Sequence, residues 1–222
     1  MTVAENPLYK DLVKQFGDAL HDAAFITEKP KQIISVSPKL DLALGGGVPE
    51  GSLFIMTGPE KIGKTVTALS FCANAQSQER FVYYGNIEGR LKKRDLEGIR
   101  ELQLGPEQFQ MVGSSEGNIL SGEDYLGIFD KVVHGHPKSV AVVDSFSALA
   151  AEAELAGELK DIQVMSIQKT QAKWCRRIGN VLPINNVTVV GITHMMANVS
   201  SFGSRKTKTE KSGTSLKYQV DV

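Results

Sequence analysis

Apolar and polar residues follow two different periods along the chain from Ile33 onward. Short apolar runs with the composition of strands occupy residues 33–36 (IISV), 52–57 (SLFIMT), 80–87 (RFVYYGNI), 109–112 (FQMV), 139–144 (SVAVVD) and 187–193 (VTVVGIT). Between them, apolar residues at helical spacing predict helices near 64–77, 91–103, 122–134 and 162–182. Strands that alternate with helices predict an α/β fold, a mostly parallel sheet with helices on both faces. SVAVVD and VTVVGI are apolar on both faces rather than alternating, as central strands of such a sheet are.

The first 32 residues have a different pattern. Asn6 and Pro7 have the character of an N-cap and a first helical residue, and we expect the helix to end near Ala24. Its apolar stripe consists of Leu8, Leu12, Val13, Phe16 and Leu20. Such a stripe must be buried on its own domain or on a neighbouring molecule, and periodicity leaves both open. We therefore expect a helix and polar linker over residues 1–32, followed by a core domain over residues 33–222.

Residues 51–65 (GSLFIMTGPEKIGKT) run from an apolar strand into a loop bracketed by glycines. Gly58 and Gly63 let the backbone curl around a polyphosphate, Lys64 reaches the β and γ phosphates, and the Thr65 hydroxyl ligates Mg²⁺. The helix that follows adds the positive end of its dipole. The alternative is a chance glycine turn between core elements. The predicted ATP-binding segment comprises Gly58, Pro59, Glu60, Lys61, Ile62, Gly63, Lys64, Thr65 and Val66.

Polar side chains stand where three of the predicted strands end. Asp144 follows a buried apolar strand, which is typical of a carboxylate that orients Mg²⁺. Glu88 could polarise the water that attacks the γ-phosphate, and His194 could contact that phosphate and report its presence. The alternatives are helix caps or a plain turn for the two acids, and an ordinary structural histidine.

A long polar loop follows His194 over residues 195–215. Within residues 205–217, five basic residues stand against the single acid Glu210, a local charge of 5 − 1 = +4. With one aromatic residue available for base contact, this composition fits single-stranded DNA binding, and a solvated charge run is the alternative. The candidate DNA-binding residues in this loop are Phe202, Arg205, Lys206, Lys208 and Lys211.

A second loop follows Asp144, with the sequence ALAAEAELAGELKDIQV. The helix after it carries Lys169 and Arg176, which could border the DNA path or simply cover a solvated face. We expect Trp174 on the same helix to be a core residue.

Composition limits the remaining possibilities. The chain has 25 basic and 25 acidic residues, so any attraction to nucleic acid must come from a local patch. Cys72 and Cys175 lie in helical apolar patterns, and we expect free thiols in a reducing compartment. No apolar run approaches 18 residues and the N-terminus is polar, which predicts a cytoplasmic protein without a membrane partner.

Taken together, these motifs resemble the RecA family of homologous-recombination proteins. The resemblance rests on GPEKIGKT, Glu88, VAVVDSFSAL followed by AEAELAGELKD, GITH, and the loop that leads to SGTSLKY, and it runs from about Ile33 to Val222. His194 resembles the phage-type members, which would place the protein in host cytoplasm.

The resemblance implies a DNA-dependent ATPase that forms a helical filament on single-stranded DNA, pairs it with homologous duplex DNA and exchanges strands. It implies that Lys64 and Thr65 bind phosphate and Mg²⁺, that Asp144 supports Mg²⁺, and that Glu88 activates water. His194 then occupies the γ-phosphate switch position. The segments at about 151–163 and 195–212 correspond to the two DNA-binding loops, and the N-terminal helix to the one that docks on a neighbouring protomer.

The sequence departs from the family pattern in three places. Lys61 and Ile62 replace small hydroxyl residues, and the segment RLKKRDLEGIREL lacks the aromatic residue that stacks on adenine. The family also continues beyond LKYQVDV, which leaves open a fragment or a reduced relative. A non-catalytic RecA-like accessory module and a hexameric helicase or clock-type ATPase are therefore kept as alternatives to a recombinase.

Overall fold

The computed structural model describes residues 6–20, 30–157, 166–197, 208–210 and 222. The chain divides into two compact units, residues 1–32 and residues 33–222. Among the described residues, no helix is long and apolar enough to cross a membrane.

The first unit contains α1 (Pro7–Phe16) and the short 3₁₀ helix η2 (Gly17–Ala19). The Asn6 side chain accepts a hydrogen bond from the backbone N–H of Leu8 at 2.9 Å, so the predicted N-cap is confirmed. The predicted end near Ala24 is wrong, because α1 ends at Phe16, where Gly17 follows and the backbone tightens into η2. No residue of α1 is buried.

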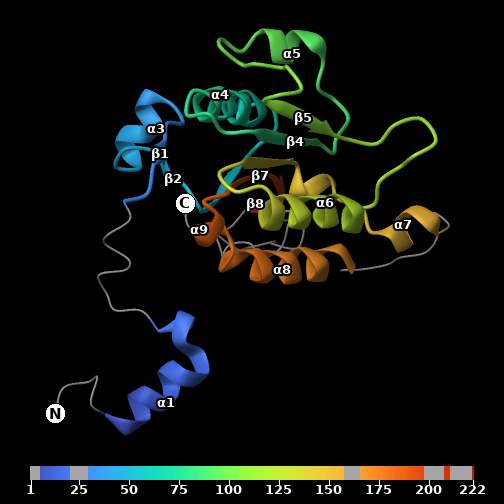
Figure 1. Ribbon diagram of the computed structural model, residues 1–222. Helices are drawn as coiled ribbons and strands as arrows, with labels where there is room; N and C mark the ends of the chain where they lie inside the picture. Colours follow the sequence, from blue (N-terminus) through green and yellow to red (C-terminus); the bar gives the residue numbers. More distant parts are fainter. Residues whose placement is uncertain (1–5, 21–29, 158–165, 198–207, 211–221) are drawn as a thin grey trace. The chain divides into compact units, whose positions relative to one another are not determined.

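The second unit is built on a sheet of five parallel strands in the order β3-β7-β6-β4-β5 (Figure 1). In sequence order they are β3 (Leu53–Gly58), β4 (Val82–Asn86), β5 (Phe109–Val112), β6 (Val140–Asp144) and β7 (Thr188–Ala197). The predicted α/β class and parallel sheet are thus confirmed. Because β7 lies between β3 and β6, the strand that leads to His194 separates the phosphate-loop strand from the strand that leads to Asp144.

Helices cover both faces of this sheet (Figure 1). On one face α4 (Lys64–Gln76) packs through Leu69 and Phe71. On the other face lie α6 (Gly122–Gly135), α8 (Ser166–Gly179) and α9 (Leu182–Asn185).

Strand β6 shows why a central strand carries apolar residues on both faces. All five of its residues are buried. Val140 and Val142 belong to the core on the α4 face, whereas Ala141 and Val143 belong to the core on the α6 and α8 face. Successive side chains of a strand point to opposite faces, so a strand covered on both sides needs apolar residues on both, and only its last residue, Asp144, is charged.

Several predicted boundaries are wrong for local reasons. The run IISV forms only β1 (Ile33–Ile34), which pairs antiparallel with β2 (Val48–Pro49) in a separate two-stranded sheet, because α3 (Pro38–Ala43) begins directly after it. The helix expected over 91–103 is limited to α5 (Lys93–Glu97), since Gly98 ends it. The helix expected over 162–182 is two helices, because Gly179 ends α8 and Pro183 lies in the first turn of α9.

Both predicted loops contain regular structure. The loop after Asp144 includes the 3₁₀ helix η3 (Phe146–Ala148) and α7 (Glu152–Ala156). The loop after His194 is shorter than expected, because β7 continues to Ala197 and pairs antiparallel with β8 (Lys208–Glu210). The remaining loop residues, 158–164, 198–207 and 211–215, lie outside the part of the chain that the structure describes.

The two cysteines are free and buried, as predicted. Cys72 lies in the core on the α4 face and Cys175 in the core on the opposite face. Burial raises the pKa of Cys175 to about 12. Trp174, next to Cys175 on α8, is also buried, in agreement with its assignment to the core.

A buried ion pair joins the starting ends of three parallel strands. Arg80, which precedes β4, pairs with Glu50, which precedes β3, and donates to the carbonyl of Asn186, which precedes β7, at 3.1 Å. This pairing adds a side-chain contact to the parallel register that aligns the three strands.

Candidate nucleotide-binding and hydrolysis site

The carboxyl ends of four parallel strands bring the predicted site residues to one edge of the sheet. In the strand register His194 lies beside Gly58, and Asp144 lies beside Asn86. Glu88 follows two residues after Asn86. Segments that are more than a hundred residues apart in sequence therefore meet in one place, where α/β proteins commonly bind ligands.

The loop between β3 and α4 has the geometry of an anion cradle. Gly63 has φ of +95°, in the left-handed region that favours glycine, and α4 begins at the next residue, Lys64. Lys61 also has a positive φ, +61°, which is uncommon for a residue other than glycine. The backbone N–H groups at the start of α4 thus face the loop, as in an anion-binding helix terminus.

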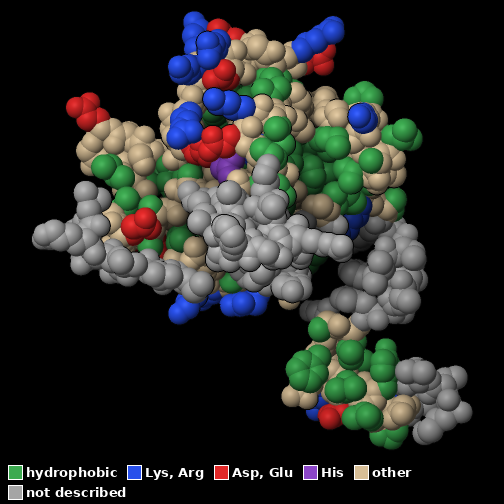
Figure 2. Space-filling model, turned by 180° about the vertical axis from the view of Figure 1, so that it is seen from behind, with side chains coloured by type: hydrophobic (Ala, Val, Ile, Leu, Met, Phe, Trp, Pro, Cys, Tyr) green, Lys and Arg blue, Asp and Glu red, His purple; other side chains and the backbone are tan. Residues whose placement is uncertain are grey.

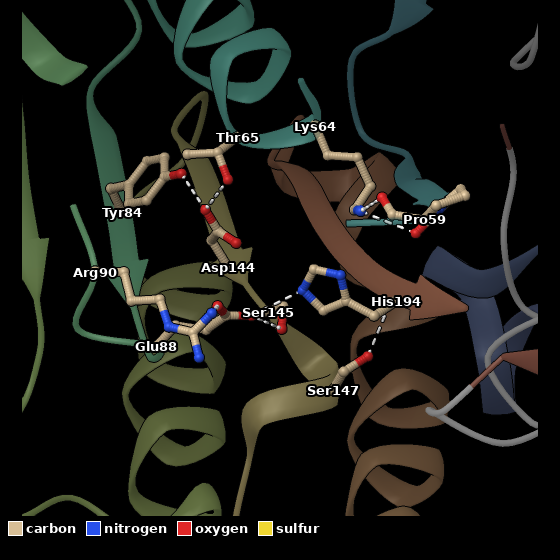
Figure 3. A network of polar contacts seen from close by, with 11 residues as sticks. Pro59, Lys64, Thr65, Tyr84, Glu88, Arg90, Asp144, Ser145, Ser147 and His194 are labelled. Carbon is tan, nitrogen blue, oxygen red and sulfur yellow. Dashed lines mark hydrogen bonds and ion pairs between the residues drawn. The ribbon is translucent and has the colours of Figure 1, made fainter. Parts of the chain in front are cut away.

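The Lys64 ammonium lies over this loop. It donates to the carbonyls of Gly58 and Pro59, at 2.9 Å and 2.6 Å (Figure 3). Burial lowers the pKa of Lys64, and the carboxylates of Asp144 and Glu88 partly oppose that shift. An ammonium has three donors and no acceptor, so it suits a phosphate oxygen as a further partner.

Thr65 and Asp144 form an oxygen pair beside the loop. The Thr65 hydroxyl donates to Oδ2 of Asp144 at 2.9 Å, and the Tyr84 hydroxyl donates to the same oxygen at 2.7 Å (Figure 3). Burial raises the pKa of Asp144, although the hydrogen bonds from Tyr84 and Thr65 counteract part of the shift. The sequence interpretation missed Tyr84, because only the pairing of β4 with β6 shows that it faces Asp144.

The pair fits Mg²⁺ better than a metal that needs a complete protein cage. Among the described residues, no group of three or more His, Cys, Asp or Glu side chains could hold a metal ion. Mg²⁺ prefers oxygen ligands and commonly takes only one or two from the protein, with the rest from water and phosphate. A hydroxyl and a carboxylate on neighbouring elements therefore suffice.

Glu88 lies at the centre of a second cluster. Its Oε1 accepts hydrogen bonds from Ser145 Oγ at 2.9 Å and from His194 Nε2 at 2.8 Å, and its Oε2 lies 3.5 Å from Nη1 of Arg90 (Figure 3). Burial alone would raise the pKa of Glu88, but the hydrogen bonds from His194 and Ser145 and the nearby charges hold it below its usual value. The carboxylate is therefore ionised near neutral pH. Since it can only accept hydrogen bonds, Nε2 of His194 carries the proton in this pair.

His194 is held from its backbone as well. Its backbone N–H donates to Ser147 Oγ at 2.9 Å, whereas its ring Nδ1 is buried and has no hydrogen-bond partner among the residues that the structure describes. The neighbouring Thr193 hydroxyl lies 2.8 Å from that of Thr57 on β3. The histidine thus links β7, at the point where its pairing with β3 ends, to the acid that follows β4.

Helix capping or a plain turn was the alternative to a site role for Asp144 and Glu88. Gly89 does form a turn, with φ of +64° and its N–H donating to the Asn86 carbonyl at 3.2 Å. The Glu88 side chain nevertheless faces Ser145 and His194, and the hydrogen bonds of Asp144 come from side chains on β4 and α4. The geometry favours site residues over caps.

Two cavities of about 310 Å³ open at this edge of the sheet. Both are lined by Glu60, Glu88, Arg90 and His194. Figure 2 shows acidic side chains beside a histidine on this face, with lysine and arginine side chains nearby. The walls of one cavity also include Lys61, Thr65, Val66, Leu69, Leu91, Asp95 and Asp144. The apolar part of this wall is aliphatic, in keeping with the missing aromatic residue noted in the sequence.

Of the predicted DNA-binding residues, the structure describes the side chains of Lys169 and Arg176. Lys169 and Arg176 are exposed on α8 and line neither of the two cavities. Lys208 lies in β8, next to Ala197 of β7. Phe202, Arg205, Lys206 and Lys211 lie outside the described residues.

The fold and the loop define an α/β protein with a phosphate-loop motif at the carboxyl edge of a parallel sheet. The family model of the RecA N-terminal domain matches residues 9–222. The chain belongs to the RecA family, and its second unit has the RecA-type core.

Curated relatives extend well beyond this chain. It is 30% identical over 226 residues to Protein RecA of Streptomyces venezuelae, covering 98% of this chain and 54% of that protein. It is 29% identical over 229 residues to Protein RecA of Gloeothece citriformis, and the match covers 99% of this chain and 60% of that protein. It is 32% identical over 206 residues to Protein RecA of Mycolicibacterium smegmatis, and the match covers 88% of this chain and 55% of that protein. The chain thus spans little more than half of these relatives. All three are bacterial, so they give no support to the phage-type resemblance of His194.

Proposed function

We propose that this chain is a DNA-dependent ATPase of homologous recombination. It binds Mg²⁺ and ATP at the carboxyl edge of its sheet, forms a helical filament on single-stranded DNA, and promotes pairing and strand exchange with homologous duplex DNA. The observation that carries the proposal is the meeting of two hydrogen-bonded pairs, Thr65 with Asp144 and Glu88 with His194, beside a phosphate loop. Such a protein acts on DNA in the cytoplasm.

Nucleotide binding begins with the phosphate loop. The backbone N–H groups between Gly58 and Val66 surround the β and γ phosphates, and the ammonium of Lys64 exchanges its loop carbonyls for phosphate oxygens. Thr65 and Asp144 would hold Mg²⁺, which would supply positive charge to neutralise the phosphate oxygens. Burial disfavours an isolated charge on Asp144, so a cation beside it would lower the pKa of this carboxyl.

Hydrolysis is assigned to Glu88. The ionised carboxylate orients a water molecule for in-line attack on the γ-phosphorus and accepts its proton. Oε1 is already shared by Ser145 and His194, which fixes the direction of the carboxylate. Preorganisation of this kind reduces the cost of reaching the transition state.

His194 couples the nucleotide to DNA in this proposal. A γ-phosphate near Glu88 competes for the Nε2 proton of His194, and β7 continues from His194 through Ala197 to its pairing with β8. A shift of His194 therefore acts on the strand that leads into the basic loop after β7. The loop residues Phe202, Arg205, Lys206, Lys208 and Lys211 contact single-stranded DNA, together with Lys169 and Arg176, and α1 docks on the neighbouring protomer.

Negative-stain electron microscopy with a strand-exchange assay tests the assembly. With ATP and single-stranded DNA the proposal expects helical filaments and transfer of a labelled strand into homologous duplex, but no transfer into heterologous duplex. Rings would support the hexameric helicase or clock-type alternative. Nucleotide or DNA binding without filaments or exchange would support the accessory module.

A further inference from the structure

Arg90 is placed at the chemical centre of the candidate site, although it is an exposed residue in a strongly basic segment. Its side chain is 80% exposed, and Nη1 lies 3.5 Å from Oε2 of the proposed catalytic base Glu88. Arg90 lines both cavities that meet at Glu88 and His194. Figure 3 shows it reaching toward Glu88 from the segment after β4.

The contact with Glu88 does not by itself explain this position. A hydrogen bond to a guanidinium is usually 2.7–3.2 Å long, roughly, so the 3.5 Å contact holds Arg90 only loosely. Exposed ion pairs contribute about 0–1 kcal/mol to stability. A guanidinium has five N–H donors in a planar fork that matches two phosphate oxygens, and the one loose contact that Arg90 makes with the described residues leaves this capacity largely unused.

The neighbouring basic residues give a comparison within the same segment. Arg94 is also 80% exposed and forms a similarly long contact, 3.6 Å, with Asp95. It lines neither cavity. Position, rather than the basic composition of the segment, therefore distinguishes Arg90.

We propose that Arg90 is an arginine finger supplied by the same chain that binds the nucleotide. The inference rests on the proposed ATPase function and adds a catalytic residue to it. As water attacks, a bond forms between its oxygen and the γ-phosphorus, and the bond from that phosphorus to the β–γ bridging oxygen breaks. The electron pair of the broken bond stays on ADP, and the proton of the water passes to Glu88. Arg90 transfers nothing; it moves from Glu88 to the γ-phosphate oxygens and neutralises charge that develops there.

The test uses Arg90→Ala and Arg90→Lys, with Arg94→Ala as the matched control. Arg90→Ala is expected to lower kcat for ATP hydrolysis by about 100-fold or more, while the Kd of a non-hydrolysable ATP analogue changes by less than about threefold. Arg90→Lys recovers only part of the rate, because a point charge lacks the planar fork. Arg94→Ala retains the parental rate.

Binding of ADP with aluminium fluoride separates a finger from a residue that acts only through Glu88. This complex mimics the transferred phosphoryl group, so Arg90→Ala should lose affinity for it while it keeps affinity for the ATP analogue. If Arg90 only holds Glu88, the affinity for aluminium fluoride stays parental, and the acid side of the pH–rate profile moves to higher pH because the pKa of Glu88 rises without the cation. That result overturns the proposal.

The remaining outcomes also separate the two proposals. A parental chain that hydrolyses ATP, together with an Arg90→Ala variant as active as Arg94→Ala, overturns the finger alone. A parental chain that binds ATP but does not hydrolyse it overturns the ATPase function as well.

Discussion

His194 Nε2 donates a hydrogen bond to Oε1 of Glu88 over 2.8 Å, which joins the residue assigned to sensing the γ-phosphate directly to the residue assigned to activating water. The two lie 106 positions apart in sequence. Because one carboxylate oxygen serves His194 and Ser145 together, a change at the histidine alters both the direction and the protonation of the acid. Sensing and hydrolysis are therefore expected to be coupled.

His194→Ala tests this coupling. The variant is expected to bind single-stranded DNA with similar affinity in ATP and ADP, whereas the parent binds more tightly in ATP. Loss of the hydrogen bond also raises the pKa of Glu88. As the pH is lowered, the variant therefore begins to lose its hydrolysis rate at a higher pH than the parent does. Fluorescence anisotropy with labelled DNA and a pH–rate profile measure the two effects. His134→Ala, at an exposed position on α6, is the control, and retained discrimination between ATP and ADP in His194→Ala would contradict the coupling.

Glu88→Gln separates nucleotide binding from chemistry. The amide keeps the size of the side chain but cannot accept the proton of water, so ATP and Mg²⁺ binding are retained while hydrolysis slows by about 100- to 10,000-fold. In the parent, the low pKa of Glu88 keeps the carboxylate ionised at neutral pH, and activity is lost only as the pH falls through that lowered value. Single-turnover hydrolysis and equilibrium nucleotide binding give the two quantities. A variant with the parental rate would place the base elsewhere.

The chemistry of the site could be predicted from sequence wherever it depends on local patterns. The phosphate loop is contiguous, and the runs at residues 140–144 and 188–193, which are apolar on both faces, predict central strands. Contacts across the sheet are different, since they depend on the strand order. The bonds from Tyr84 to Asp144 and from His194 to Glu88 require β6 to lie between β4 and β7, and no local pattern specifies that order.

Errors in element boundaries have a similar cause. The run at Ile33 is apolar and β-branched, and nothing local shows that it pairs with Val48–Pro49 rather than with the main sheet. The extension of β7 to Ala197 depends on its pairing with β8, and the sequence of β8 (KTE) is too polar to predict a strand. The sequence did not distinguish Arg90 from its neighbours as a site residue, because four of the five residues from 90 to 94 are basic.

Asp144→Asn is expected to affect ligand binding and stability in opposite directions. Burial raises the pKa of Asp144, so the folded protein loses stability as the pH rises from the unfolded value of about 3.9 through the raised folded value. At pH 7, without ligand, the Asn variant should be at least as stable as the parent, because its amide can still accept from Thr65 and Tyr84. Its gain in Tm on addition of Mg²⁺ and ATP should disappear.

Thermal unfolding with and without Mg²⁺ and ATP measures both effects. Glu97→Gln, at an exposed ion pair with Lys93, serves as the control for removal of a carboxylate. A destabilised Asp144→Asn variant that keeps the full ligand-induced rise in Tm would argue against this carboxylate as a support for the metal.

The basic loop after β7 makes a prediction about salt. Neutralising Arg205, Lys206 and Lys208 together should weaken single-stranded DNA binding at all sequences and flatten the log–log salt slope by up to about 2, at roughly 0.7 per phosphate contact. Phe202→Ala should cost about 1–3 kcal/mol if a base stacks there, with little change in slope. Neutralising the exposed Lys39 and Lys131 should change neither quantity, and a triple variant with the parental slope would assign the DNA contacts to another surface.

The most direct test of the central claim is the rate of ATP hydrolysis by the parent chain, measured with and without single-stranded DNA, next to that of Lys64→Ala. The ammonium of Lys64 lies over the phosphate loop, and its charge-assisted bonds to phosphate should contribute about 1.5–3 kcal/mol each. We expect hydrolysis that DNA stimulates in the parent and that is abolished in Lys64→Ala. Hydrolysis that is absent in the parent, indifferent to DNA, or unchanged in Lys64→Ala would contradict a DNA-dependent ATPase at this site.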